Sequence, residues 1–207
     1  MMASPMSSSQ RYRITIVLIA ANVALYIYTS IAGGNFFVTN YTNTTIQLTQ
    51  YNAAVFQGAY YQLFTSMFIH ANIVHLAGNM LFLLIFGLRG EEMFTLPEYL
   101  TVYLLGGIAG NLLSLLMGPQ MISLGASGAI FALFGGVAVY ARRSIGQSII
   151  GALIFGFFLL IISSGADVNY LAHIGGLGAG LSMGYIMYKV RKPQLTYRKT
   201  YSYTTPF

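Results

Sequence analysis

Long apolar runs separated by short polar segments make up most of this chain. Six runs approach the roughly 20 residues that a helix needs to cross a bilayer, and they cover residues 14–31, 73–88, 97–117, 127–140, 145–163 and 168–188. Pro97 opens the third run, and proline suits the first turn of a helix. The pattern predicts an all-α membrane protein, built as a six-transmembrane-helix bundle.

The connection between the first two runs, residues 33–72, is long. It begins with neutral polar residues at 40–45 and becomes aromatic towards Tyr60, Tyr61 and Phe64. Loops of this length usually carry function or lack order, and the later aromatic part is typical of amphipathic structure in a membrane interface. We therefore predict a long, partly membrane-embedded first external loop.

Composition also favours a membrane protein. Hydrophobic residues make up 56% of the sequence and charged residues 7%, with a mean hydropathy of +0.67, whereas a soluble domain has about 25% charged residues. The sequence contains no cysteine. This absence excludes thiolate catalysis, disulfides and cysteine-bound metals.

The positions of the basic residues predict an orientation. They lie at the ends of apolar runs, in four clusters: Arg11 and Arg13, Arg89, Arg142 and Arg143, and the stretch 189–199. This arrangement is typical of the cytoplasmic loops of multi-pass proteins and not of a phosphate-binding face. Despite the net charge of +6, we therefore expect no nucleic-acid partner. Both termini are predicted to be cytoplasmic, in a protein of the cell membrane.

The same pattern suggests a simple domain organisation. Residues 1–13 form a polar cytoplasmic leader without the features of a signal peptide. Residues 14–190 form the six-helix membrane domain, and residues 191–207 form a basic cytoplasmic tail.

Polar groups with catalytic potential interrupt three of the apolar runs. Ser127 lies in the turn Gly125-Ala126-Ser127-Gly128, and His173 lies near the start of the sixth run. His75 and Asn79, four residues apart, share one face of the second run. Because these three runs cross in the same direction, their polar groups lie at similar depth. Ionisable groups inside a membrane are costly and suggest function.

These residue types predict hydrolytic chemistry. A serine hydroxyl becomes nucleophilic when a neutral histidine takes its proton, so Ser127 and His173 are the expected nucleophile and base. The start of the fourth run supplies free backbone N–H groups, and His75 and Asn79 add donors for an oxyanion. The glycines at 125 and 128 allow a tight turn. Asp167, the nearest acidic residue, lies in a loop six residues before His173, so we predict a dyad.

Together these residues resemble the rhomboid family of intramembrane serine proteases, over residues 60–188. The resemblance rests on three motifs in order along the chain: His70-x4-His75-x3-Asn79, Gly125-x-Ser127-Gly128, and Ala172-His173-x2-Gly176-x3-Gly180. It implies cleavage of transmembrane protein substrates near the outer membrane face. The implied roles are Ser127 as nucleophile, His173 as base, and His75 with Asn79 as oxyanion donors.

The resemblance also assigns supporting roles. Gly176 and Gly180 would let the sixth span pack closely on the fourth, and Glu91 matches a structural acidic position. Phe131 stands where many bacterial members stack a tyrosine on the histidine. Tyr61-Gln62 replaces a frequent Trp-Arg pair, which puts the anchoring of the external loop in question. His70 is interpreted as structural, with a supporting hydrogen bond to the site as the alternative.

Two other functions fit parts of the sequence. A non-proteolytic relative would bind membrane proteins as clients, although such proteins typically lose the serine or the histidine, and both are present here. A metal or proton transporter would use the three histidines, but these lack nearby carboxylates and a His-Glu-x-x-His motif. We therefore predict no metal and no cofactor, with the lipid bilayer and transmembrane proteins as partners.

Overall fold

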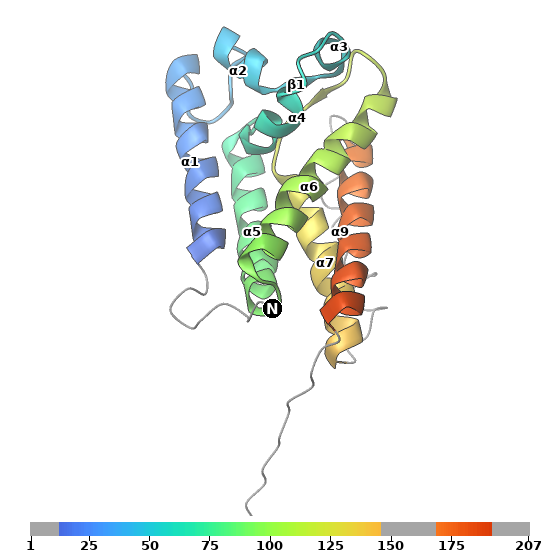
Figure 1. Ribbon diagram of the computed structural model, residues 1–207. Helices are drawn as coiled ribbons and strands as arrows, with labels where there is room; N and C mark the ends of the chain where they lie inside the picture. Colours follow the sequence, from blue (N-terminus) through green and yellow to red (C-terminus); the bar gives the residue numbers. More distant parts are fainter. Residues whose placement is uncertain (1–12, 146–168, 192–207) are drawn as a thin grey trace, which may run out of the picture.

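In the part of the chain that the structure describes, five long helices pack side by side (Figure 1). The structure is a computed structural model, and it describes residues 13–145 and 169–191. The long helices are α1 (Arg13–Gly33), α5 (Ile73–Met93), α6 (Leu96–Ser114), α7 (Ser127–Ile145) and α9 (Tyr170–Arg191). The apolar core lies between α5, α6 and α7, where the side chains of Leu83, Val102 and Leu133 have no exposed surface.

Three of the described helices are long and apolar enough to span a membrane. They are Arg13–Gly33, Ile73–Met93 and Leu96–Met117, and Ser127–Ala141 is a shorter apolar helix. These helices agree with an all-α membrane protein. The fifth predicted span, 145–163, lies outside the described residues except for Ile145, which belongs to the end of α7 and so was placed in the wrong run. The count of six spans stays a prediction.

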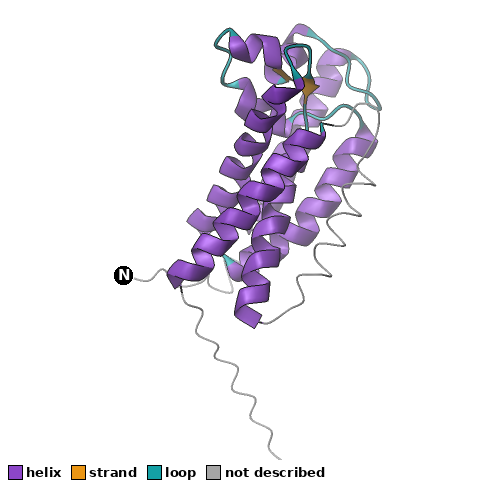
Figure 2. Ribbon diagram, turned by 90° about the vertical axis from the view of Figure 1, so that its right-hand side faces the viewer, coloured by secondary structure: helices purple, strands orange, loops and turns teal. Residues whose placement is uncertain are grey.

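The short elements gather at one end of the helices, together with most of the loops (Figure 2). Between α1 and α5 the chain forms α2 (Asn43–Leu48), β1 (Gln50–Tyr51), α3 (Asn52–Phe56), α4 (Gln62–Thr65) and η1 (Ser66–Phe68). After α6 come the 3₁₀ turn η2 (Leu115–Met117) and β2 (Ile122–Ser123). β1 pairs antiparallel with β2, with Gln50 opposite Ser123. The first connection is therefore joined to the segment that leads into α7.

Buried amides anchor this first connection. Gln62 accepts a hydrogen bond from the Tyr51 backbone N–H at 3.0 Å and donates one to the Gln47 carbonyl at 3.2 Å. Gln50 donates to Ser114 Oγ at 2.8 Å, although β1 and α6 are far apart in sequence. The replacement of a Trp-Arg pair by Tyr61-Gln62 put the anchoring of this connection in question. In the structure, Gln62 is one of the residues that hold the connection in place.

α7 and α9 approach each other at the level of the backbone. A Cβ added at Gly176 would lie 2.0 Å from the Gly128 carbonyl oxygen, and one added at Gly180 would lie 2.0 Å from the Ala132 carbonyl oxygen. No side chain fits such a gap. Small residues permit this kind of close helix contact in membrane proteins, so these two glycines set the distance between α7 and α9.

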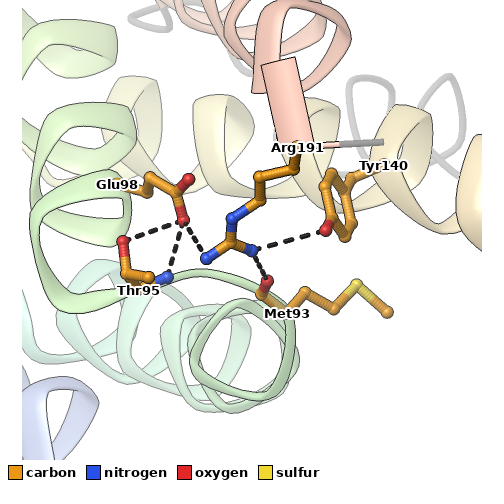
Figure 3. A network of polar contacts seen from close by, with 5 residues as sticks. All are labelled: Met93, Thr95, Glu98, Tyr140 and Arg191. Atoms are coloured by element: carbon orange, nitrogen blue, oxygen red, sulfur yellow. Dashed lines mark hydrogen bonds and ion pairs between the residues drawn. The ribbon is translucent and has the colours of Figure 1, made fainter. Parts of the chain in front are cut away.

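Arg191 joins the end of α9 to α5, α6 and α7 (Figure 3), at the end of the bundle away from the short elements (Figure 1). Its guanidinium lies 2.9 Å from Glu98 Oε2 in α6 and donates to the Met93 carbonyl of α5 at 2.9 Å and to the Tyr140 hydroxyl of α7 at 3.3 Å. Glu98 also accepts the Thr95 N–H at 2.7 Å, which caps the first turn of α6. The last residue of α9 is therefore fixed to its neighbours.

Glu91 holds α1 against this bundle. Its carboxylate is 2% exposed and accepts the Thr15 backbone N–H at 2.7 Å. Thr15 Oγ1 lies 3.0 Å from the Tyr99 hydroxyl in α6. A first-turn N–H has no partner within its own helix, so this buried contact fits the structural role expected for Glu91.

Candidate active site

Ser127 and His173 meet across two helices. Ser127 begins α7, and His173 lies in the first turn of α9. The distance from His173 Nε2 to Ser127 Oγ is 2.8 Å. A hydroxyl at this distance from an unprotonated ring nitrogen can pass its proton to the ring. For Nε2 to accept the proton, the neutral imidazole must carry its own proton on Nδ1.

Nδ1 of His173 is buried and has no hydrogen-bond partner among the described residues. Asp167, the nearest acidic residue in the sequence, lies outside them. Phe131, one turn after Ser127, stacks on the imidazole with ring centroids 4.7 Å apart and planes at 29°. The ring of His173 is therefore oriented by an aromatic face on one side and by the serine at Nε2.

The turn before Ser127 depends on glycine. Gly125 has φ 119°, a backbone conformation that residues with a side chain rarely adopt. A Cβ at this position would also lie 2.9 Å from the ring of His75. The Gly125 N–H donates to the Ser66 carbonyl at 2.9 Å. Glycine is thus required here twice, for the turn and for the approach of His75.

His75 and Asn79 project from α5 towards this turn. The His75 ring is the nearest group to Gly125, and Asn79 Nδ2 lies 3.7 Å from the Cβ position built there. Asn79 donates one N–H to the His75 carbonyl at 3.0 Å, which leaves its second N–H for another acceptor. Asn72 caps α5 by accepting the His75 N–H at 2.7 Å. This cap fixes the turn that carries His75.

His70 lies behind His75 and is completely buried. The two rings meet edge to face with centroids 5.3 Å apart, and the His70 carbonyl accepts the Thr39 hydroxyl at 2.6 Å. Burial, and then the neighbouring His75, lowers the pKa of His70 from 6.5 to about 3. His70 therefore packs against His75 as a neutral ring.

The residues predicted from the sequence thus come together from three helices. α7 and the turn that leads into it carry Gly125, Ser127, Gly128 and Phe131. α5 carries His75 and Asn79, and α9 carries His173, Gly176 and Gly180. Within residues 13–145 and 169–191, no group of three or more His, Cys, Asp or Glu side chains is arranged to hold a metal ion.

Asn169 was not predicted from the sequence as part of the site. It precedes α9, and its side chain contacts both the first turn of that helix and Ser123. An asparagine directly before a helical run is a recognisable capping signal. The contact with Ser123, 46 residues away in sequence, has no such signal.

Comparisons with known proteins place this chain in a family. Residues 57–190 match the Rhomboid domain family. The chain is 36% identical over 133 residues to RHOMBOID-like protein 6, mitochondrial, of Arabidopsis thaliana, covering 61% of this chain and 43% of that protein. It is 36% identical over 131 residues to Rhomboid-like protease 3 of Toxoplasma gondii, covering 59% of this chain and 50% of that protein.

Bacterial relatives are similar over a longer part of the chain. Putative rhomboid protease YdcA of Bacillus subtilis is 29% identical over 183 residues, which cover 84% of this chain and 88% of YdcA. The chain spans half or less of the length of the plant and Toxoplasma relatives named above. The family match and the apolar helices together identify a multi-pass membrane protein.

Proposed function

The chain belongs to the rhomboid family, and we propose that it is an intramembrane serine endopeptidase with a Ser127–His173 dyad. It would hydrolyse peptide bonds of transmembrane substrate proteins near the outer membrane face. The observation that carries the proposal is the 2.8 Å contact between His173 Nε2 and Ser127 Oγ. Relatives named as rhomboid proteases support the reaction class.

The first half of the reaction forms an acyl-enzyme. Ser127 Oγ attacks the carbonyl carbon of the scissile bond while Nε2 of His173 takes the hydroxyl proton. The tetrahedral intermediate carries its negative charge on the former carbonyl oxygen. It collapses as the C–N bond breaks, and His173 gives its proton to the leaving amine. The acyl group then remains as an ester on Ser127.

Three donors are proposed for the oxyanion. The backbone N–H of Ser127 lies at the start of α7, where N–H groups have no partner within the helix. The free N–H of Asn79 and the ring of His75 approach the same turn from α5. Donors fixed in advance stabilise a developing charge without reorganising during the reaction.

The second half of the reaction releases the product. A water molecule attacks the ester, His173 takes a proton from this water, and Ser127 recovers its own proton as the ester bond breaks. This step needs water inside the membrane domain. Ser127 is partly exposed, and irregular backbone at membrane depth is tolerated where it lines a water-filled cavity.

The membrane arrangement belongs to the same proposal. Residues 14–190 form the catalytic domain with six spans, and the flanking segments 1–13 and 191–207 are cytoplasmic. The lipid bilayer is the medium of both enzyme and substrate. The basic residues support this orientation, and the cell membrane is the proposed location.

The second candidate is a non-proteolytic rhomboid-like protein that binds transmembrane clients. The same bundle would suit it, because lateral contact with another helix needs no chemistry. The hydrogen-bonded serine and histidine favour the protease, since client binding gives no reason for a part-buried Ser–His contact inside a membrane domain.

Cleavage of a model single-span substrate by the purified protein in detergent tests the proposal. Wild type is compared with Ser127→Ala and with Ser182→Ala, which removes an exposed hydroxyl of α9. We expect product from wild type and Ser182→Ala with or without a chelator, and none from Ser127→Ala. A fluorophosphonate probe should label the two active proteins only.

Other outcomes contradict the proposal. Product that survives in Ser127→Ala would exclude this serine as nucleophile. Product that disappears with the chelator would indicate a metal-dependent reaction. The absence of both cleavage and labelling in wild type, with retained binding of the substrate, would favour the client-binding candidate.

A further inference from the structure

The side chain of Asn169 makes two hydrogen bonds at the start of α9. Its Oδ1 accepts the Ala172 backbone N–H at 3.0 Å, and its Nδ2 donates to Ser123 Oγ at 2.5 Å. A backbone N–H can only donate, so the first contact fixes which end of the amide faces Ser123. Both side chains are buried, with 9% and 5% of their surface exposed.

These two contacts connect the segments that carry the dyad. Ser123 lies four residues before Ser127, and Asn169 lies four residues before His173. The amide therefore joins the segment before Ser127 to the segment before His173, and each end of the hydrogen bond lies four residues before a residue of the dyad. Farther along, the same helices are held together by the glycine contacts at 176 and 180.

Ser123 is itself held in place. It is paired with Gln50 in the short sheet of β1 and β2, and two residues later the Gly125 N–H is bound by the Ser66 carbonyl. A hydrogen bond to Ser123 thus ties the first turn of α9 to a fixed strand. Without it, the cap on Ala172 would remain, but α9 would lose its direct side-chain contact with the segment before Ser127.

We propose that Asn169 is a positioning residue for the Ser127–His173 dyad, acting through its hydrogen bond to Ser123. The inference rests on the proposed protease function. Asn169 does not touch the reacting atoms; it sets the separation of the two side chains that do. Displacing a reacting group by about 1 Å can cost about 100-fold in rate, so even a small relaxation of α9 lowers turnover.

Three substitutions distinguish the hydrogen bond between Asn169 and Ser123 from the cap that Asn169 provides for α9. Ser123→Ala removes the acceptor and leaves the cap intact. Asn169→Ser keeps a good capping residue, but its shorter side chain does not reach Ser123. Asn169→Asp restores both contacts, because one carboxylate oxygen accepts the Ala172 N–H and the other accepts the Ser123 hydroxyl proton. Thr95→Ala serves as the control, since it weakens a cap on α6 at the opposite end of the bundle.

The readouts are kcat and KM on the model substrate, the rate of fluorophosphonate labelling of Ser127, and the melting temperature. We expect Ser123→Ala and Asn169→Ser each to lower kcat and the labelling rate by about tenfold, with KM nearly unchanged. The double variant, which combines Ser123→Ala with Asn169→Ser, should lose no more rate than either single variant, because both substitutions remove the same hydrogen bond. Asn169→Asp should recover most of the rate, and Thr95→Ala should change only the melting temperature.

Different results overturn different statements. Asn169 would be only a helix cap if the rates of the variants followed their melting temperatures. The same conclusion would follow if the losses multiplied in the double variant, or if Asn169→Asp were as slow as Asn169→Ser. If cleavage is lost in Ser127→Ala but Ser123→Ala cleaves as fast as wild type, this inference alone is overturned. Absent cleavage and labelling in wild type, or cleavage that survives Ser127→Ala, would overturn the proposed function and this inference with it.

Discussion

The positive φ of Gly125 and its contact with His75 make the turn before Ser127 depend on a missing side chain. Gly128 is close-packed as well, because an added Cβ would lie 3.3 Å from the Ala172 carbonyl oxygen, next to His173. The proposed nucleophile therefore stands between two positions at which the backbone itself is the packing surface. The two glycines, Gly125 and Gly128, shape this site as much as its polar residues do.

At this scale, the proposed roles of the polar residues predict unequal losses. Ser127→Ala and His173→Ala should abolish cleavage while the protein stays folded. Asn79→Ala should reduce turnover by less, since one oxyanion donor contributes at most about 3–4 kcal/mol. Turnover numbers and melting temperatures of the three variants check this. An Asn79→Ala variant as inactive as the other two would contradict the division of roles.

His70 predicts a dependence of stability on pH. Its pKa is about 3 in the folded protein and 6.5 without the fold, so below about pH 6.5 the unfolded chain binds a proton that the folded chain does not. The stability is therefore fully present above that pH and falls towards pH 3, by up to about 1.4 kcal/mol per pH unit.

Replacing His70 removes the pH dependence of stability that comes from its lowered pKa. The difference in free energy of unfolding between wild type and His70→Gln, measured in detergent at about pH 7 and about pH 5, should shift by about 2 kcal/mol against wild type at the lower pH. The other histidines are common to both proteins and largely cancel. A difference that stays constant with pH would mean that His70 is not held neutral by burial.

At the scale of elements, α7 and α9 are joined by backbone contacts. Gly180→Ala would place a methyl group 2.0 Å from the Ala132 carbonyl oxygen, and overpacking of this kind costs about 1–3 kcal/mol. Gly178→Ala is the matched control in the same helix, because nothing lies within 4 Å of its added Cβ. We expect a lower melting temperature for the first variant only. Equal changes in the two variants would show that the contact with Ala132 is not responsible.

The sequence predicted these long helices better than it predicted what joins them. Apolar length and the motif glycines were enough for α5, α6, α7 and the approach of α9 to α7. Ile145 was assigned to the wrong run because no proline or glycine marks the end of α7 directly after Arg143. The first connection could be recognised only as a loop, since its short helices have too few residues for a hydrophobic period.

At the scale of the whole molecule, Arg191 and Glu98 close the end of the bundle away from Ser127. Arg191→Ala should lower the free energy of unfolding by about 1–2 kcal/mol, because it removes an ion pair and two hydrogen bonds to other helices. Lys189→Ala removes the same charge from an exposed position in the same turn, where the ammonium contacts only the Tyr185 ring among the described residues, at 5.6 Å from its centroid, and should cost less, about 0.5 kcal/mol.

Thermal unfolding of the two variants measures this difference, and substrate cleavage by the folded protein should be unchanged in both. A loss of activity in Arg191→Ala at temperatures where it is fully folded would mean that this end of the bundle influences the dyad.

The residues proposed for the dyad could be chosen from the sequence because their chemistry is local: a serine between glycines, and a histidine within an apolar run. The supporting contacts could not. Gln62 with Tyr51, and Asn169 with Ser123, join residues 11 and 46 positions apart through amides that look like ordinary loop residues. Only the three-dimensional path of the chain makes each amide a buried partner of a particular group.

The glycine contacts between α7 and α9 have a consequence for membranes of different thickness. A helix longer or shorter than the local hydrocarbon layer responds by tilting. Because three successive turns of α9, at Gly176, Gly180 and Gly184, lie against the backbone of α7, we expect the two helices to tilt as one body. Adaptation to a thinner or thicker bilayer would then fall on the other helices, and the spacing of Ser127 and His173 would be preserved.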